Sequence, residues 1–500
     1  MKTLKRVFGI LNYSEKKRFI IVCFFLMILT VFEVVGIGLI FPIISFVINP
    51  DKFILLLNKY DYFNIFSNLD ITKTSQLFLV LIFLFYLIKF LMSVLLNFYK
   101  SKILYGISAS ISRRMYEGYT HQTLSFFNKS NSAYIIRNII DMPNKYVSRV
   151  LVGIYTIGFE VCFISLLFLM FIKIQPQIGY SILGICLVFI ISFNLSQKNK
   201  TKIYGKSLDT KVAERLKVTK ESLEGIQDLH IFNKHDYFQR IFDNNNFRVA
   251  NLITKLELKS TLPRLILELV GVSFFLAIIF YLFFTNQAID SSLPVLGVTA
   301  AAMVRLIPSV SKILSFSNGI HASQNAINEL DKELNKFKKI KENNHEFFSL
   351  KNSLNFKNIS FCYDDQKILF SNMNFDIQKN SIFGISGESG KGKTTILNLL
   401  LGFLNPKEGE ISVDGKNIQN NIKNWQKIIS FIPQKIFISD GTIKENICYG
   451  LERSEINKEK LKRACELSGV ANFIKNFDDL DQKIGERGTL LSSGQIQRVG

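Results

Sequence analysis

The chain has 500 residues, which leaves room for two or three domains, and 48% of them are hydrophobic, including 46 phenylalanines. The net charge of +21 arises from 61 basic and 40 acidic residues, and the basic residues cluster beside apolar runs. The positive-inside rule and attraction to anionic lipid explain that clustering, so we exclude nucleic acid as a partner and expect membrane lipid instead. The six cysteines are scattered without a C-x-x-C pair, which argues against disulfides and a zinc site.

Six apolar runs predict six transmembrane helices, at residues 19–48, 75–98, 150–174, 178–195, 262–284 and 293–317. Most of these runs reach the roughly 20 residues that a helix needs to cross the bilayer core, and the fourth is the shortest. Buried helices of a soluble protein are the alternative, but six such runs in one domain have no soluble counterpart. We therefore expect a helical membrane domain at residues 1–320.

The distribution of Lys and Arg predicts the orientation of this domain. Thirteen basic residues lie between Lys198 and Lys259, in the loop after the fourth span, whereas the loop after the fifth span has Asp290 and no basic residue. The N-terminal segment and the loop after the second span are also basic. Both termini are thus expected in the cytoplasm. Residues 321–349 are polar and rich in Lys and Asn, which predicts a helix that fades into a linker.

The segment from Gly387 to Thr394 fits the phosphate-binding P-loop, G-x-x-x-x-G-K-[ST]. Its glycines allow consecutive backbone N–H groups to cradle an anion, Lys393 can reach the β- and γ-phosphates, and the Thr394 hydroxyl can hold Mg²⁺. Residues 381–385 predict a buried strand before the loop, and residues 395–401 predict a helix after it, so that the phosphate lies at a helix N-terminus. A chance Gly-rich turn is the alternative, and the strand–loop–helix order disfavours it. The expected nucleotide contacts are Gly387, Glu388, Ser389, Gly390, Lys391, Gly392, Lys393, Thr394 and Thr395.

Three further stretches, at residues 361–363, 431–434 and 491–498, resemble in their order the A-loop, Q-loop and signature of an ATP-binding cassette (ABC) domain. The resemblance covers residues 350–500 and implies that Tyr363 stacks on adenine and that Gln434 approaches Mg²⁺ or the attacking water. Lys393 and Gln434 are then the candidate catalytic residues, and Thr394 and Gln434 the candidate metal ligands. The signature residues that would contact ATP are Ser492, Ser493, Gly494 and Gln495. Ser493 departs from the usual L-S-G-G-Q, which puts the local geometry in doubt.

Six spans followed by a cassette resemble an ABC exporter half-transporter of the type IV class. That resemblance implies an α-helical membrane domain fused to an α/β P-loop domain, and a homodimer that sandwiches two ATP molecules between the P-loop of one chain and the signature of the other. ATP binding would then shift the spans between inward- and outward-facing states. The family's Walker B aspartate, catalytic glutamate, D-loop and switch histidine are expected beyond residue 500. We therefore interpret the cassette as incomplete at its C-terminus and the chain as the first part of a longer protein.

Charged residues inside the predicted spans point to the substrate, because such residues are costly in a bilayer and usually functional. Lys89, Arg264 and Arg305 are three cations against one anion, Glu33, which favours an anionic substrate. The alternative is that these side chains are hydrated or extend to the membrane surface. Around these cations the chain resembles bacterial lipid-linked oligosaccharide flippases, in residues 86–89, 263–264 and 305–309.

The likeness implies ATP-driven flipping of an anionic lipid-linked glycan across the bacterial inner membrane, with the basic residues meeting a diphosphate. Two alternatives stay open. One is an exporter of drugs, lipids or peptides. The other is a nucleotide-gated membrane regulator without productive hydrolysis, for which Ser493 is the only indication.

Overall fold

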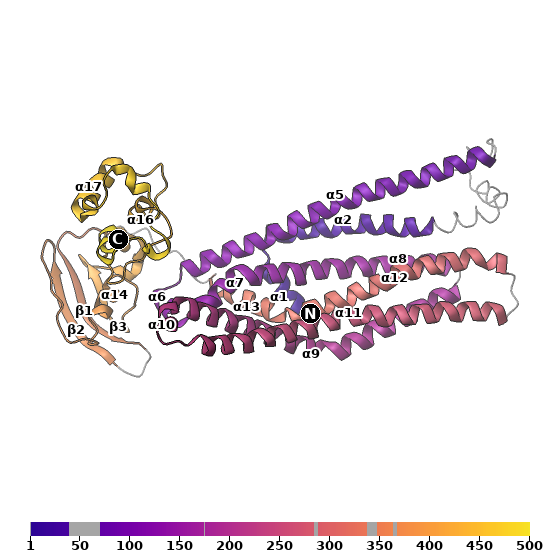
Figure 1. Cartoon of the computed structure of the whole chain (residues 1–500), viewed down its shortest axis with the longest axis horizontal. Helices are drawn as coiled ribbons and strands as arrows, with labels where there is room; N and C mark the ends of the chain where they lie inside the picture. The colour runs from indigo at the N-terminus through magenta and orange to yellow at the C-terminus, as the bar shows by residue number, and fades with distance from the viewer. Residues whose placement is uncertain (1, 40–70, 175, 285–288, 338–347, 364–367) are drawn as a thin grey trace. The chain divides into compact units, whose positions relative to one another are not determined.

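The computed structural model describes residues 2–39, 71–174, 176–284, 289–337, 348–363 and 368–500 (Figure 1). The chain divides into two compact units, Met1–Lys341 and Glu342–Gly500. The first unit is built from helices alone in its described part, and the second combines helices with a sheet. The predicted domain limits at residues 320 and 350 stay predictions.

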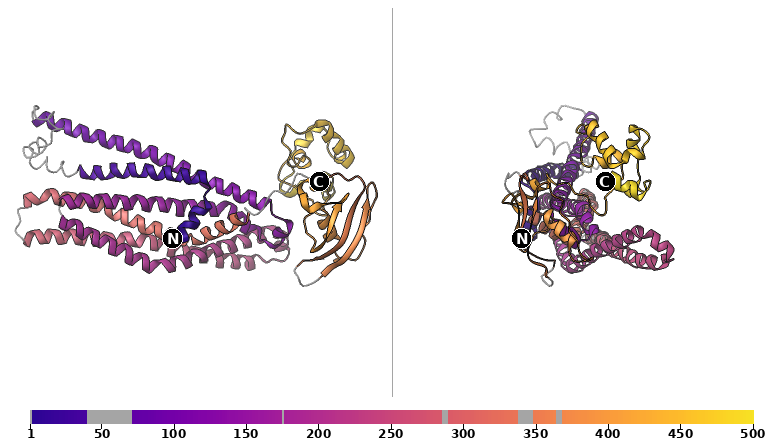
Figure 2. Two further views of the ribbon diagram at one scale, coloured as in Figure 1. Left: turned by 180° about the vertical axis from the view of Figure 1, so that it is seen from behind. Right: turned by 90° about the vertical axis from the view of Figure 1, so that its left-hand side faces the viewer.

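The helices of the first unit are long, and several run alongside one another in Figure 1 and in the left view of Figure 2. They are α1 (Lys2–Ile10), α2 (Tyr13–Gly38), α5 (Ile71–Thr120), α6 (Leu124–Lys129), α7 (Ser132–Lys145), the π-helix η2 (Tyr146–Leu151), α8 (Val152–Ile174), α9 (Pro176–Glu224), α10 (Ile226–Ile231), α11 (His235–Phe284), α12 (Ile289–Ala322) and α13 (Gln324–Phe337). The helices α5, α9 and α11 have 50, 49 and 50 residues and continue well past the predicted spans. Hydropathy marks where a helix would cross lipid, whereas a polar segment of good helix formers continues the same helix.

Five helical segments in the described residues are long and apolar enough to cross a membrane: Tyr13–Gly38, Leu79–Thr120, Ser132–Leu169, Gly179–Glu224 and His235–Phe280. They overlap the first five predicted spans, although residues 40–48 of the first span lie outside the described part. The sixth predicted span lies within α12, and the count of six stays a prediction. The first apolar stretch of α5 is almost entirely exposed, with outward-facing Phe83 and Phe90, as expected of a surface that contacts lipid chains.

Helix α13 belongs to the largest core of the first unit. Ile327 and Leu330 are completely buried there and pack with α1, α5, α7 and η2. Residues 324–337, expected as part of a helix fading into a linker, therefore form a packed helix. Most of the remaining predicted linker, residues 338–347, lies outside the described part.

The second unit contains a four-stranded sheet with the order β2-β1-β3-β4, in which all neighbours are antiparallel. Its strands are β1 (Ser353–Cys362), β2 (Ile368–Gln378), β3 (Glu408–Val413) and β4 (Lys416–Asn417). Its helices are α14 (Lys393–Leu400), η3 (Ile418–Asn421), α15 (Ile422–Gln426), α16 (Ile443–Ile447), α17 (Lys458–Ser468), η4 (Val470–Asn472), η5 (Phe477–Asp481), η6 (Glu486–Gly488) and α18 (Ser493–Val499). The predicted helix after the P-loop is thus confirmed as α14.

Two hydrophobic cores hold this unit together. Phe356, Ile411 and Leu399 belong to a core between the sheet and α14, whereas Leu461 and Val499 belong to a separate core formed by the later helices. The turn between β3 and β4 is fastened to the start of β1, because the Asp414 carboxylate accepts hydrogen bonds from backbone N–H groups of residues 351–353. Those hydrogen bonds, chiefly from Lys351, lower the pKa of Asp414.

The strand predicted at residues 381–385 is absent from the structure, and we correct that prediction here. This segment has no regular structure, and the Ile382 side chain is fully exposed rather than buried. A β-strand needs a neighbour to pair its backbone groups, and no strand of the described sheet pairs with this segment. Its apolar sequence alone does not supply that neighbour.

Candidate functional site

The P-loop turns at glycines that no other residue could replace without strain. Gly390 and Gly392 have φ angles of +83° and +96°, in the region that favours glycine. A Cβ atom at Gly392 would also lie 2.5 Å from Cζ of Phe370 on β2. Because Gly392 caps α14, the unpaired N–H groups of the first helical turn and the positive end of the helix dipole meet at the loop. This arrangement fits a phosphate group.

Lys393 lies across this loop. Its Nζ donates hydrogen bonds to the carbonyl oxygens of Gly387 and Glu388, at 2.6 and 2.8 Å. The ammonium group is therefore held at the mouth of the backbone cradle by carbonyls of the loop itself. The same position would allow it to contact the outer phosphates of a nucleotide.

The structure brings Tyr363 to the P-loop helix. Its hydroxyl lies 2.9 Å from Oγ1 of Thr395, and its exposed ring packs edge-on against Phe361 with the centroids 5.0 Å apart. An exposed aromatic face beside a phosphate cradle is the arrangement that adenine and the phosphates of one nucleotide require. The roles of the P-loop and Tyr363 toward ATP, and of the Thr394 hydroxyl toward Mg²⁺, stay predictions.

Gln434 is exposed in a segment without regular structure. The preceding helix α15 is fastened to the end of α14, because Trp425 Nε1 donates to the Leu400 carbonyl at 2.7 Å and Gln426 Nε2 to the Leu401 carbonyl at 2.9 Å. No hydrogen bond in the described residues joins Gln434 itself to the P-loop. Its roles toward Mg²⁺ and water stay predictions.

The signature residues lie at the start of α18. This helix packs in the core formed by the later helices and not in the core between the sheet and α14. Ser492 caps the helix: its hydroxyl accepts from the Gln495 N–H at 3.3 Å, while the Gln495 side chain accepts from the Ser492 N–H at 2.8 Å. This capping box holds both side chains in place. Ser493 and Gly494 are exposed and available to another molecule. Their contact with ATP stays a prediction.

A cluster of ion pairs lies among the long helices of the first unit. Glu33 on α2 contacts Nζ of Lys89 on α5 at 3.3 Å and Nε of Arg305 on α12 at 3.6 Å. Glu160 on α8 contacts Nη1 of Arg305 at 3.3 Å and Nζ of Lys312 at 3.0 Å. Arg305 therefore joins two carboxylates, and we call these five residues the charge cluster. Its formal charge is +1, from three cations and two carboxylates.

The two carboxylates of the charge cluster differ in burial. The Glu160 side chain is 1% exposed and uses one oxygen for each of its two cations, whereas the Glu33 side chain is 24% exposed and offers a single oxygen to both of its partners. Arg305 is further held by the Ser309 hydroxyl at 2.8 Å and by the ring of Phe163 at 4.5 Å from its centroid. Arg305 is thus the best-supported side chain of the cluster.

The sequence analysis identified Lys89 and Arg305 but missed Glu160 and Lys312. Both missed residues lie inside predicted spans, so a search of those spans for every charge would have found them. Arg264 is not brought to the cluster by any described interaction. It pairs with Glu268 one turn along α11 at 2.8 Å, and its side chain is 66% exposed.

Comparison with known proteins assigns each of the two units to a described protein family. The family description "ABC transporter transmembrane region" matches residues 19–307, and the description "ABC transporter" matches residues 370–500. The first match alone covers more than half of the chain. The chain belongs to the ABC transporter family. It is a multi-pass membrane ABC transporter chain with the organisation of an exporter half-transporter.

Three relatives illustrate the functions described for proteins similar to this ABC transporter. A protein of Vibrio parahaemolyticus serotype O3:K6 described as an ATP-dependent lipid A-core flippase is 25% identical over 475 residues, 92% of this chain and 80% of that protein. A multidrug resistance ABC transporter ATP-binding and permease protein of Lactococcus lactis (strain IL1403) is 33% identical over 199 residues, 39% of this chain and 34% of that protein. The heterocyst differentiation ATP-binding protein HepA of Nostoc sp. (strain PCC 7120) is 24% identical over 402 residues, 79% of this chain and 64% of that protein.

The chain thus spans about a third of the Lactococcus relative and less than two thirds of the Nostoc relative. A solved structure described as a bacterial Atm1-family ABC exporter with ATP bound matches this chain with a TM-score of 0.76 and 17% sequence identity. The match covers 98% of this chain and 83% of the chain in that structure. This likeness shows the ABC exporter fold.

Proposed function

We propose that the full-length protein uses ATP hydrolysis to translocate an anionic lipid-linked oligosaccharide, or a related amphipathic anion, across the bacterial inner membrane, with the cassette on the cytoplasmic side. The observation that carries this proposal is the charge cluster, which places Lys89, Arg305 and Lys312 among apolar helices with fewer carboxylates than cations. Charges in such surroundings are costly and usually functional. Relatives described as lipid A-core flippases support an anionic lipid as the cargo.

The geometry of the cluster suggests how a phosphate would bind. Glu160 is buried and paired twice, so it keeps Arg305 oriented. Glu33 is more exposed and its single oxygen lies 3.3 and 3.6 Å from its partners, which makes it the easier carboxylate to displace. A diphosphate offers more oxygen acceptors than one carboxylate and could contact Lys89 and Arg305 together. Arg264 remains a candidate contact at a separate place on α11.

The nucleotide would bind at a site shared by two copies of the chain. Lys393, Thr394, Tyr363 and the loop backbone would hold ATP and Mg²⁺ from one side, with Gln434 near the metal. The signature residues Ser492, Ser493, Gly494 and Gln495 of the second copy would contact the phosphates. Support comes from the exposed position of the signature, whose helix lies in a core separate from that of the P-loop. ATP hydrolysis would supply the free energy for transport.

Multidrug export is the second candidate, because the Lactococcus relative carries that description at 33% identity. It predicts transport of apolar cations, which the positive charge cluster disfavours. Regulation without hydrolysis receives no support from Ser493, which is exposed and makes no described side-chain hydrogen bond.

The experiment compares transport with ATP turnover in reconstituted vesicles. Arg305→Gln should slow flipping of a diphosphate-linked lipid about ten- to a hundredfold, because a hydrogen bond to a charged group contributes roughly 1.5–3 kcal/mol. Basal ATPase activity should persist, and Arg305→Lys should restore part of the transport because it keeps the charge.

Arg113→Gln is the matched control, since Arg113 is exposed and pairs only with Glu117 on its own helix in the described part of the chain. It should leave both activities unchanged. Normal flipping of the diphosphate lipid by Arg305→Gln would show that Arg305 has a structural role and would remove the main support for an anionic cargo.

A further inference from the structure

Helix α11 contains a proline in its interior, at the predicted cytoplasmic start of the fifth span. Pro263 has no backbone N–H, so it cannot donate the hydrogen bond that the Lys259 carbonyl would otherwise accept at this point of an α-helix. The helix nevertheless continues from His235 to Phe284. The Lys259 carbonyl therefore needs a donor from outside its own helix.

Asn318 of α12 is that donor. Its Nδ2 lies 3.1 Å from the Lys259 carbonyl oxygen, and the residue is only 5% exposed. The side chain of Lys259 reaches a third helix, because its Nζ donates to Gln197 of α9. The contact with α12 thus replaces the hydrogen bond that Pro263 removes, and it lasts only while α11 and α12 keep their present relation.

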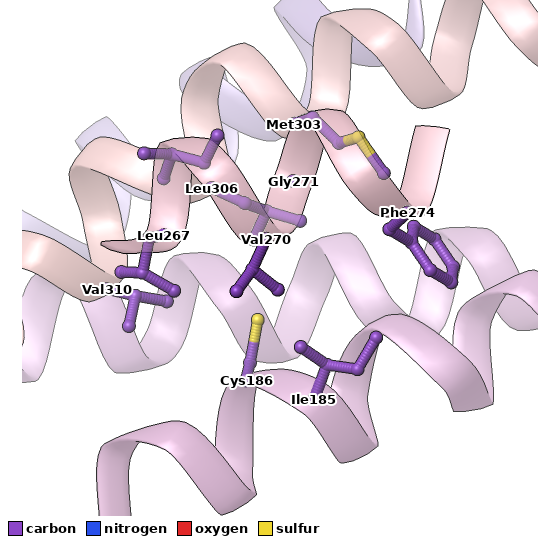
Figure 3. Close-up of a pocket in the computed structure, with 10 residues that line it drawn as sticks. Ile185, Cys186, Leu267, Val270, Gly271, Phe274, Met303, Leu306 and Val310 are labelled. Atoms are coloured by element: carbon purple, nitrogen blue, oxygen red, sulfur yellow. The ribbon is translucent and has the colours of Figure 1, made fainter. Parts of the chain in front are cut away.

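After Pro263, α11 is packed closely against α12. Leu267 belongs to a buried core with Val310 of α12. Gly271 allows a close approach, since a Cβ atom there would lie 2.9 Å from Cδ1 of Ile307. Figure 3 shows the two helices facing each other in this region, around an apolar cavity of about 50 Å³. This half of α11 should therefore move together with α12.

Before Pro263, the polar contacts of α11 tie it to α9. Oδ1 of Asn246 accepts a hydrogen bond from Nη1 of Arg215 at 2.9 Å. The Lys259 ammonium lies 5.2 Å from the ring centroid of Tyr204, which is also on α9. The two halves of α11 thus have different main attachments, and Pro263 lies where one attachment gives way to the other.

A cavity of about 180 Å³ lies beside this point, and Ser260 of α11 and Asn318 of α12 both line it. One water molecule needs roughly 10–15 Å³, so the cavity has room for several. Water there could donate to the Lys259 carbonyl if Asn318 moved away. Because a water-mediated hydrogen bond is nearly as favourable as a direct one, the cost of losing the Asn318 contact would be small.

Pro143 of α7 offers an instructive contrast. It removes the same kind of hydrogen bond, and Oγ of Ser112 on α5 donates to the freed Ile139 carbonyl at 2.7 Å. Met142 and Tyr146, on either side of this proline, are both buried in the largest core of the first unit. One core therefore holds α7 before and after Pro143, which makes this proline a fixed interruption.

We propose that Pro263 is a hinge in α11 and that Asn318 is the positioning residue that holds this hinge in the present conformation. When ATP binding shifts the spans, Asn318 leaves the Lys259 carbonyl and water from the cavity replaces it. The half of α11 before Pro263 then turns with α9, while the half after it stays with α12. This inference rests on the ATP-driven cycle of the proposed function but not on the identity of the cargo.

The first experiment tests the role of Asn318 in the full-length protein without nucleotide, by hydrogen exchange and mass spectrometry. Asn318→Leu keeps a side chain of similar size but removes the donor, so exchange at residues 259–267 should become about tenfold faster. Pro263→Ala supplies a backbone N–H to the Lys259 carbonyl. In that background Asn318→Leu should therefore change the exchange by less than about twofold. No acceleration, or the same acceleration in both backgrounds, would overturn the proposal.

The second experiment adds a non-hydrolysable ATP analogue and no cargo. In the wild type, exchange at residues 259–267 should rise to the level of Asn318→Leu, whereas Pro263→Ala should lose this response. Misfolding would not explain the loss, because alanine is the better residue in a helix interior and Pro263→Ala should not lower the unfolding midpoint.

Pro143→Ala is the matched control and should respond to the analogue like the wild type. Loss of the response in Pro143→Ala as well would overturn the proposal, since it would show a general effect of removing a helix proline. Exchange that changes only in other parts of the chain would overturn the hinge while leaving the ATP-driven cycle intact. No change anywhere in the chain would refute that cycle, and the use of the hinge with it.

Discussion

At the scale of single residues, Lys393 is the side chain on which nucleotide use should depend most. Its ammonium is held at the mouth of the P-loop by the carbonyls of Gly387 and Glu388. Lys393→Ala removes the positive charge that would meet the outer phosphates, so ATP turnover by the full-length protein should fall to background. Insertion into the membrane should be unaffected, because Lys393 packs in no core of the first unit. Unchanged ATPase activity in this variant would refute the assignment of Lys393.

The two carboxylates of the charge cluster should differ in their effect on stability. Glu160→Gln leaves Arg305 and Lys312 without their buried counter-ion, and breaking a buried ion pair typically costs about 3–5 kcal/mol. Glu33→Gln should cost less, because Glu33 is more exposed and its contacts are longer. Thermal unfolding of the purified variants in one detergent would measure this. Equal unfolding midpoints would contradict the distinction between a fixed and a displaceable carboxylate.

At the scale of elements, the signature helix α18 depends on its first residues. Ser492→Ala removes the cap and should destabilise the helix start by about 0.5–2 kcal/mol, which would appear as faster hydrogen exchange of the α18 amides. Ser493→Gly, which restores the usual L-S-G-G-Q, changes an exposed side chain outside the capping box. We expect it to alter ATPase activity by no more than about twofold. A large gain in activity would instead show that Ser493 weakens the site.

Local sequence predicted these elements well where the determinants are local. The glycines of the P-loop specify their own backbone geometry, so the loop and α14 could be anticipated. The place of Tyr363 beside them was expected only from the family resemblance, because its contact with Thr395 joins residues 32 positions apart. The strand expected at residues 381–385 was wrong because pairing depends on a neighbouring strand, which hydropathy does not report. The partner of Arg305 was missed for a related reason. The contact with Glu160 joins residues 145 positions apart, and only the packing of α8 on α12 brings them together.

At the scale of the whole molecule, the proposed homodimer predicts a specific outcome for mixed dimers. Combining a Lys393→Ala chain with a Ser492→Arg chain leaves one doubly damaged site and one intact site, because each site takes its P-loop and its signature from different chains. Mixed dimers should therefore bind ATP tightly at one site, as counted by equilibrium binding. Isolated monomers that hydrolyse ATP at the full rate would contradict the shared site.

The most direct test of the central proposal is ATP-dependent flipping of a fluorescent polyprenyl-diphosphate-linked sugar in vesicles that contain the full-length protein. The assay follows the loss of fluorophore from the leaflet accessible to a quencher, beside a lipid of equal chain length with a neutral head group. We predict rapid movement of the diphosphate lipid that requires ATP and stops in Lys393→Ala, and little movement of the neutral lipid. Equal ATP-driven rates for the two lipids would contradict selection of an anionic cargo by the charge cluster.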